Sequence, residues 1–132
     1  MRGLTLTDER VILYVFAHPD DESFMTVGTA CRYGEEGVRV ALVTATLGEE
    51  GGAGDPPVCT REELPAVREA ELRRAAGILG IGSVDLLGYR DKQLAAAPHA
   101  EGSVAKIILE HRGSLATLPL QGLIGRDLSN WL

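Results

Sequence analysis

The residues best suited to chemistry in this chain are one imidazole and three carboxylates in a single short turn. The turn reads His18-Pro19-Asp20-Asp21-Glu22. A neutral histidine nitrogen and an aspartate oxygen three positions apart can converge on one divalent cation, which leaves the adjacent aspartate free to act on a water at the metal. The spacing therefore predicts a zinc hydrolase site.

The same turn has a simpler interpretation as the start of a helix. Asp20 or Asp21 would cap a helix beginning near Glu22, and Glu22 would do no more than favour the helix N-terminus electrostatically. Pro19 stiffens the turn and restricts the residue before it. A single aspartate would favour the cap, but the whole run directly after a hydrophobic strand favours the metal site.

The elements that must position this turn alternate between two periodicities. The turn follows an apolar run over residues 11–17, rich in β-branched and aromatic residues and typical of a buried central strand. The patterns downstream predict helices over 22–36, 62–79 and 101–111, and strands over 38–46, 83–87 and 115–118. This alternation predicts an α/β fold with a mostly parallel sheet and helices on both faces. Ligands of such sheets bind at the carboxyl ends of the strands, where the turn lies.

A glycine-rich, acidic connection over residues 47–60 is long for a compact domain. Its glycines lack the spacing of a dinucleotide fingerprint, and its acidity suits phosphate badly. Long connections are usually functional, so we expect a mobile loop that lines the site, with a plain flexible linker as the alternative.

Two isolated polar residues have ordinary interpretations when taken alone. Arg68 would lie on a solvated helix face among ion pairs, and Asp91 would be a turn residue. Neither predicts a function without its neighbours.

Composition limits the class of protein. The 132 residues predict one domain spanning 1–132, and the net charge of -6 argues against a nucleic-acid partner or an anionic membrane surface. Cys31 and Cys59 have neither metal-site nor disulfide-framework spacing, so we expect reduced thiols in a cytoplasmic protein. No targeting or membrane segment is visible in this sequence.

Taken together, these segments resemble the LmbE-like, or PIG-L, family of zinc-dependent N-acetylglucosaminyl de-N-acetylases. The resemblance runs from Val11 to about Gly125. It rests on Ala17-His18-Pro19-Asp20-Asp21-Glu22, Thr46-Leu47-Gly48-Glu49-Glu50-Gly51, Arg68-Glu69-Ala70-Glu71-Leu72 with Ile78-Leu79-Gly80, and Gly88-Tyr89-Arg90-Asp91. It implies a Rossmann-like, three-layer α/β/α fold.

The resemblance also implies residue roles. His18 and Asp21 would be zinc ligands, Asp20 the general base, and Arg68 and Asp91 contacts to the sugar. Zinc would lower the pKa of its water and polarise the amide carbonyl, and iron(II) is an alternative metal for such ligands.

The chain departs from the family pattern near its end. The family completes its site with a His-Pro-Asp-His motif whose last histidine is the third zinc ligand, but Ser129 stands at that place here. Catalytic zinc normally has three protein ligands, so His99, His111 or a histidine from a neighbouring subunit would have to supply the third.

We expect the C-terminal part of the family fold to be missing, which would expose a sheet edge and favour a homo-oligomer. The sequence predicts a metal-dependent hydrolase that removes the acetyl group from a small N-acetylglucosamine conjugate. The alternative is a catalytically impaired remnant of the fold that acts as a non-enzymatic binding or interaction module, and the absent third ligand favours it.

Overall fold

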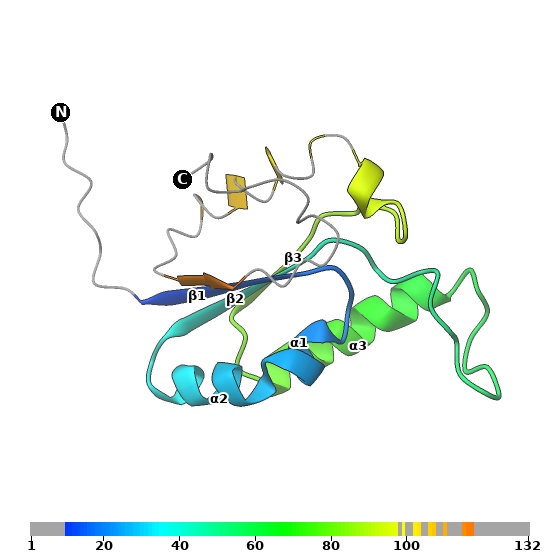
Figure 1. The fold of residues 1–132 in the computed structure, drawn as a ribbon. Coiled ribbons are helices and arrows are strands. Elements are labelled where there is room, and N and C mark those ends of the chain that lie inside the picture. The colour runs from blue at the N-terminus through cyan, green and yellow to red at the C-terminus, as the bar shows by residue number, and fades with distance from the viewer. Residues whose placement is uncertain are drawn as a thin grey trace.

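A computed structural model describes residues 10–97, 99, 102, 103, 106, 107 and 110, and the backbone of residues 115–117. Figure 1 shows the elements in chain order. They are β1 (Val11–Phe16), α1 (Asp21–Met25), α2 (Val27–Glu35), β2 (Arg39–Thr44), α3 (Leu64–Ile78), β3 (Ser83–Leu86), the 3-10 helix η1 (Leu94–Ala96) and β4 (Leu115–Thr117).

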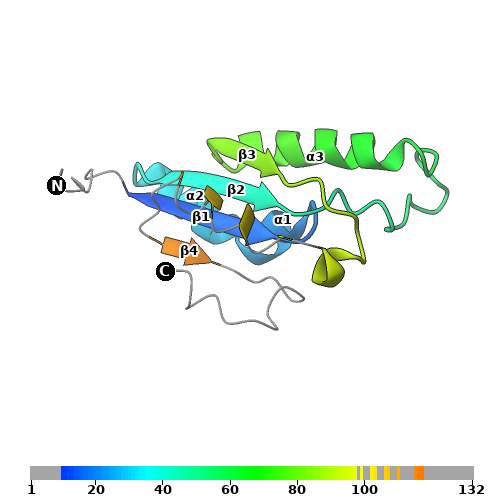
Figure 2. The ribbon, with the colours of Figure 1, turned by 90° about the horizontal axis from the view of Figure 1, so that it is seen from above.

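The described strands form one parallel sheet in the order β3-β2-β1-β4 (Figure 2). Val11 pairs with Arg39 and Phe16 with Thr44, so β1 and β2 match along their full length. The chain steps outward from β1 to β2 and β3, then returns to the other side of β1 for β4. Such a reversal opens a crevice at the carboxyl end of the first strand, and the predicted parallel α/β fold is confirmed.

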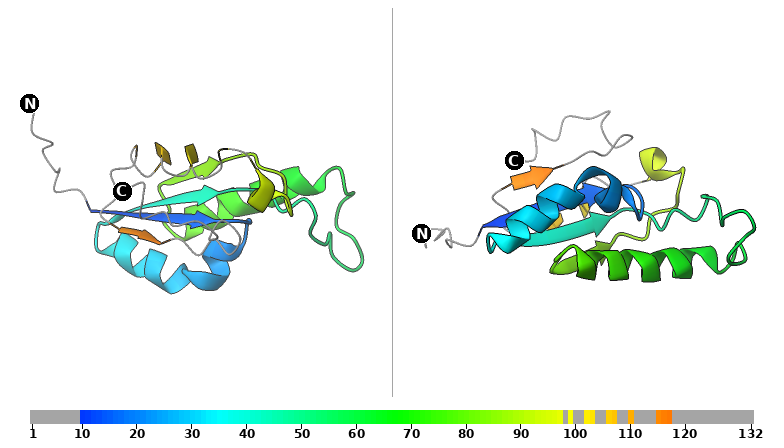
Figure 3. Two further views of the ribbon diagram at one scale, coloured as in Figure 1. Left: turned by 45° about the horizontal axis from the view of Figure 1, so that its top comes forward. Right: turned by 90° about the horizontal axis from the view of Figure 1, so that it is seen from below.

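Alternate residues of the central strands point to opposite faces and build two cores. On one face, Tyr14, Phe16 and Leu42 pack with Leu72 of α3 and Ala30 of α2. The other core contains Leu13, Val15, Ala41, Val43 and Leu94, the last of these from η1. Figure 1 shows α1, α2 and α3 below the sheet and η1 above it, and the right-hand view of Figure 3 is taken from the side of the three helices. The three-layer, Rossmann-like arrangement is therefore confirmed.

The helix expected over 22–36 is two helices that meet at Thr26. Thr26 has φ -133°, outside the helical region, and both its backbone N–H and its Oγ1 donate to the carbonyl of Glu22. The continuous helix was wrong because the periodicity of apolar residues continues across a break that one backbone angle creates.

A reciprocal cap precedes α3, which begins at Leu64. Thr60 Oγ1 accepts from the Glu63 backbone N–H at 3.2 Å, and Glu63 Oε2 accepts from the Thr60 backbone N–H at 2.9 Å. This is the capping-box arrangement, and it satisfies two backbone donors that would otherwise be unpaired.

The predicted helix over 101–111 and strand over 115–118 lie partly outside the described residues. The described members 102, 103, 106, 107 and 110 are helical, and β4 covers residues 115–117. Cys31 and Cys59 are free, partly buried thiols. In the described part of the chain, no helix is both long and apolar enough to cross a membrane.

Candidate active site

Three loops meet beyond the carboxyl ends of β1, β2 and β3. The Ala45 N–H donates to the Phe16 carbonyl at 2.8 Å, and the Tyr89 N–H donates to the Ala45 carbonyl at 3.0 Å. Thr46 adds two bonds to Ala17, from its N–H at 3.0 Å and its Oγ1 at 2.9 Å. These bonds continue the strand pairing into the loops, so segments far apart in sequence arrive at one place.

The turn after β1 is held from inside by Glu22. This side chain is buried, with Oε2 accepting from the Asp20 N–H at 3.0 Å and Oε1 accepting from Ser23 Oγ at 2.9 Å. Asp20 occupies the N-cap position with φ 102°, and its side chain makes no capping hydrogen bond. The simple capping interpretation is therefore wrong for Asp20, whose carboxylate is directed elsewhere. The electrostatic role expected for Glu22 also understates what this residue does.

His18 and Asp21 lie next to each other as the metal hypothesis requires. His18 Nδ1 is 3.7 Å from Asp21 Oδ2, which also accepts from the His18 backbone N–H at 3.1 Å. Atoms bound to one tetrahedral zinc at about 2.0–2.2 Å lie roughly 3.5 Å apart. The imidazole nitrogen and the carboxylate oxygen thus fit two positions of a zinc site.

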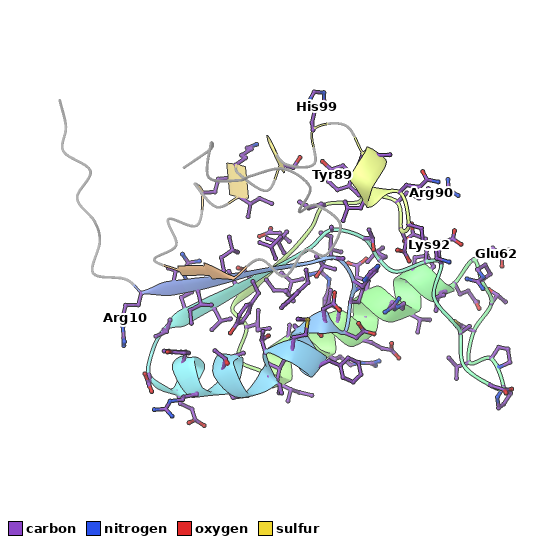
Figure 4. All side chains as sticks on the ribbon, viewed as in Figure 1. Arg10, Glu62, Tyr89, Arg90, Lys92 and His99 are labelled. Atoms are coloured by element: carbon purple, nitrogen blue, oxygen red, sulfur yellow. The ribbon has the colours of Figure 1, made fainter. Side chains whose placement is uncertain are left out.

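No third ligand joins this pair among the residues whose placement the structure gives. No group of three His, Cys, Asp or Glu side chains there is arranged to hold a metal ion. His99 is exposed and points outward from the loop that follows η1 (Figure 4). His111 and Ser129, the other positions considered for this role, lie outside the described residues.

Asp91 is buried against His18 instead of open to solvent. Its side chain is 8% exposed, and Asp91 Oδ1 lies 3.0 Å from His18 Nε2. The Lys92 N–H donates to Oδ1 at 2.8 Å and the Glu50 N–H to Oδ2 at 3.3 Å. Its neighbours Arg90 and Lys92 extend outward from the loop (Figure 4). The ordinary turn interpretation missed this inward orientation.

The charge state of Asp91 follows from these contacts. Burial by itself raises the pKa of the Asp91 carboxyl, but the hydrogen bonds from the Lys92 N–H, His18 and the Glu50 N–H outweigh it and leave the pKa below its ordinary value. An ionised carboxylate only accepts hydrogen bonds, and whether His18 Nε2 donates to Asp91 depends on the tautomer of the imidazole ring.

Glu49 holds the backbone of Asp91 in return, since its Oε1 accepts from the Asp91 N–H at 2.8 Å. Together with the bond from the Glu50 N–H to Asp91 Oδ2, this clamps the loop after β2 to the loop after β3. Sequence reasoning assigned no role to Glu49. Its position in Thr46-Leu47-Gly48-Glu49-Glu50-Gly51, one of the segments of the family resemblance, was the available signal.

Arg68 ties the turn after β1 to the glycine-rich loop. Its guanidinium donates to the Gly48 carbonyl at 2.8 Å, to the Pro19 carbonyl at 2.6 Å and to Asp20 Oδ2 at 3.2 Å. The side chain is 18% exposed, so the solvated-face interpretation was wrong. Gly48 has φ 63°, and a Cβ there would collide with the guanidinium of Arg68. The left-handed backbone favours glycine at position 48, and a Cβ there would also displace the end of the Arg68 side chain from its hydrogen bonds.

Asp20 is the exposed member of the cluster. Partial burial raises the pKa of its carboxyl, and the opposing charge of Arg68 offsets this only in part. A carboxylate with a raised pKa is a better proton acceptor than an ordinary aspartate.

A pocket of about 650 Å³ lies beside Asp20. The turn after β1, the glycine-rich loop and α3 provide its walls. Its lining includes His18, Asp20, Gly51, Arg68 and Glu71, but neither Asp21 nor Asp91. The glycine-rich loop thus lines the site, as its length and composition predicted.

Comparison with known proteins finds a family model, sequences and solved structures that are similar to this chain. The family model described as PIG-L, GlcNAc-PI de-N-acetylase, matches residues 13–124. The chain is 51% identical over 90 residues to a probable N-acetyl-alpha-D-glucosaminyl L-malate deacetylase 2 of Bacillus anthracis, a match covering 67% of this chain and 40% of the relative. It is 39% identical over 127 residues to the 1D-myo-inositol 2-acetamido-2-deoxy-alpha-D-glucopyranoside deacetylase of Actinosynnema mirum, covering 87% of this chain and 45% of the relative.

The fold also matches a solved structure, the N,N'-diacetylchitobiose deacetylase of Pyrococcus horikoshii. The TM-score is 0.74 at 27% sequence identity, and the match covers 86% of this chain and 44% of that one. The chain thus spans less than half the length of these relatives.

Proposed function

Because the chain belongs to the PIG-L family of GlcNAc-PI de-N-acetylases, we propose that it forms part of a metal-dependent hydrolase that removes an acetyl group from a small N-acetylglucosamine conjugate. Two relatives named as deacetylases of N-acetylglucosaminyl malate and of an acetamido-glucopyranosyl inositol support this substrate class. The observation that carries the proposal is the pair His18 Nδ1 and Asp21 Oδ2, 3.7 Å apart, beside the carboxylate of Asp20.

His18 and Asp21 are the residues that would hold zinc, with iron(II) as the alternative metal. When bound, the metal supplies Lewis acidity that polarises the amide carbonyl and makes water more acidic. A third ligand would come from outside the described residues or from a neighbouring subunit of a homo-oligomer. The free thiols Cys31 and Cys59 suit a cytoplasmic protein.

Asp20 serves as the general base. Its carboxylate takes a proton from the attacking water as the new C–O bond forms, and returns a proton to the nitrogen as the C–N bond breaks. Acetate and a free amine result. The raised pKa of Asp20 suits both transfers because the group can then accept and release a proton more evenly.

The family resemblance implies that Arg68 and Asp91 contact the sugar, and Arg68 is the better placed of the two for this role. Arg68 lines the pocket, where its guanidinium can also meet a sugar hydroxyl. Asp91 is buried and its oxygens already accept hydrogen bonds, so its contact with a sugar would require those bonds to change.

The test combines metal stoichiometry with turnover. Purified protein loaded with zinc is incubated with an N-acetylglucosamine glycoside, and release of the free amine is measured. We expect zinc binding, and we expect Asp20→Asn to lower the rate by about 10²–10⁴-fold with zinc retained. His18→Ala should lose both zinc and activity.

If the wild-type protein neither binds zinc nor releases the amine, the proposed enzymatic activity is contradicted. It would favour the second candidate, a catalytically impaired binding or interaction module. That candidate is favoured by one observation, the absence of a three-ligand group among the residues described.

A further inference from the structure

The contact between Asp91 and His18 joins two of the loops at the sheet edge. Asp91 comes from the loop after β3, and His18 from the turn after β1. Their side-chain atoms Oδ1 and Nε2 are 3.0 Å apart, within hydrogen-bond range, while Asp91 is absent from the pocket wall.

The two ring nitrogens of His18 face different partners. Nε2 faces the carboxylate of Asp91, which also accepts hydrogen bonds from the Lys92 and Glu50 N–H groups. The two oxygens of Asp91 therefore act as acceptors. Nδ1 faces Asp21 Oδ2 at 3.7 Å. A neutral imidazole has one protonated and one unprotonated nitrogen, and a proton on the Nε2 that faces this acceptor would leave the lone pair of Nδ1 directed toward Asp21.

We propose that Asp91 is a positioning residue that fixes the orientation and tautomer of His18, so that Nδ1 and Asp21 can bind one divalent cation. The proposal rests on the proposed function for the identity of the cation, but not for the state of His18 itself. Histidines that bind metals commonly donate their other ring N–H to a carboxylate, which orients the ring and raises its basicity.

The clamp formed by Glu49 supports this assignment. Glu49 Oε1 accepts from the Asp91 N–H at 2.8 Å, and the next residue donates its N–H to Asp91 Oδ2. With the bond from the Lys92 N–H, these contacts hold the backbone and both carboxylate oxygens of Asp91 in place beside His18. A carboxylate that orients a ligand needs such support.

The first test observes His18 in the metal-free protein by nuclear magnetic resonance. The protein contains three histidines, and His18→Gln assigns the signal of His18. At a pH where the ring is neutral, we expect a proton on Nε2 that exchanges slowly with water, and an unprotonated Nδ1. Asp91→Ala should abolish the slow exchange and populate both tautomers. A proton on Nδ1 in the wild type, or an unchanged signal in Asp91→Ala, would overturn the proposal.

The second test measures zinc affinity by competition with a chromophoric chelator. We expect Asp91→Ala to weaken zinc binding by about 10–100-fold. Asp55→Ala is the matched control, because Asp55 is exposed in the loop before α3, and it should leave the affinity unchanged. If Asp91 contacted only the sugar, Asp91→Ala would raise KM without changing zinc affinity. That result would also overturn the proposal.

Asp91→Asn provides a second variant should Asp91→Ala fail to fold. It removes the charge and one acceptor oxygen with little change in shape, and we expect weaker zinc binding and faster exchange of the Nε2 proton. If the wild-type protein binds no zinc, the proposed function fails, but the proton measurement still decides the role of Asp91.

Discussion

At the scale of single residues, the site depends on side chains that satisfy one another. Glu22 holds the backbone of Asp20, and Arg68 joins Pro19, Asp20 and Gly48 with one guanidinium. Asp20 stands at φ 102°, a sparsely populated conformation for a residue with a side chain. Backbone conformations of this kind persist only when the surroundings over-determine them, and here Glu22 and Arg68 do so.

We predict that Arg68→Lys lowers the free energy of unfolding by about 1–3 kcal/mol. A lysine ammonium cannot place donors on both the Gly48 and Pro19 carbonyls as the planar guanidinium does, so a largely buried acceptor loses its partner. Urea denaturation measures the change. The control is Arg73→Lys in the same helix, where the exposed pair with Glu69 should change stability by less than about 0.5 kcal/mol. Equal effects of the two substitutions would mean that the hydrogen bonds of Arg68 to the two loops do not stabilise the fold.

At the scale of elements, the loops beyond the sheet edge are held by their own backbone geometry and by the start of α3. The glycine-rich loop approaches Arg68 so closely that a Cβ at position 48 would displace the guanidinium, whereas Gly52 in the same loop has open space around it. The same loop runs on to Thr60 and Glu63, whose reciprocal hydrogen bonds lie directly before α3, the helix that carries Arg68.

Gly48→Ala should therefore destabilise the protein by more than about 1 kcal/mol, because alanine is strained at φ 63° and its Cβ displaces the Arg68 guanidinium. Gly52→Ala is the matched control and should have a much smaller effect. Thermal unfolding of the two variants gives the comparison. If Gly48→Ala is as stable as Gly52→Ala, then the loop relaxes away from Arg68 at little cost.

The cap of α3 predicts a dependence of stability on pH. Hydrogen bonds from the Thr60 N–H and hydroxyl lower the pKa of Glu63 below its ordinary value of 4.5. A group whose pKa is lower in the folded state stabilises that state above the unfolded pKa, and this contribution disappears as pH falls through the folded pKa. We expect Glu63→Gln to reduce the loss of stability below about pH 4.5, measured by denaturation at several pH values. If Glu63→Gln loses as much stability at low pH as the wild type, the hydrogen bonds to the Glu63 carboxylate do not contribute to stability as predicted.

At the scale of the whole molecule, two cores on opposite faces of one parallel sheet give the loops a rigid base. Central residues such as Leu13 and Leu42 are fully buried. Some apolar side chains remain at the surface, among them Phe24 of α1 and Ile78 of α3. The position of the site depends on the sheet, because β1, β2 and β3 must end at the same edge for the loops after them to meet.

Leu42→Ala should cost about 2–5 kcal/mol, since it leaves a cavity in the central strand β2 that rigid neighbours cannot fill. Ile78→Ala, at a residue 84% exposed, should change stability by less than about 0.5 kcal/mol. Chemical denaturation compares the two. A small effect at Leu42 would mean that the sheet repacks around the substitution. The sheet would then not be the rigid support that holds the loops in place.

The sequence alone determined the alternation of strands and helices, the parallel sheet and the turn of residues 18–22 at the end of the first strand. Local signals carry these features, namely the periodicity of apolar residues and a dense group of metal-ligating side chains after an apolar run. The resemblance of four segments to one family added the residue roles. The sequence also placed Arg68 and Asp91 in motifs, although taken alone each had an ordinary interpretation.

Only the tertiary structure decided what those residues contact. Asp91 reaches His18 across 73 positions and Arg68 reaches Asp20 across 48, and no local pattern encodes such pairs. The break at Thr26 and the burial of Glu22 likewise depend on contacts and backbone angles that periodicity does not record. The sheet brings these residues together because parallel strands end at one edge, and the chemistry of the turn depends on the partners that meet it there.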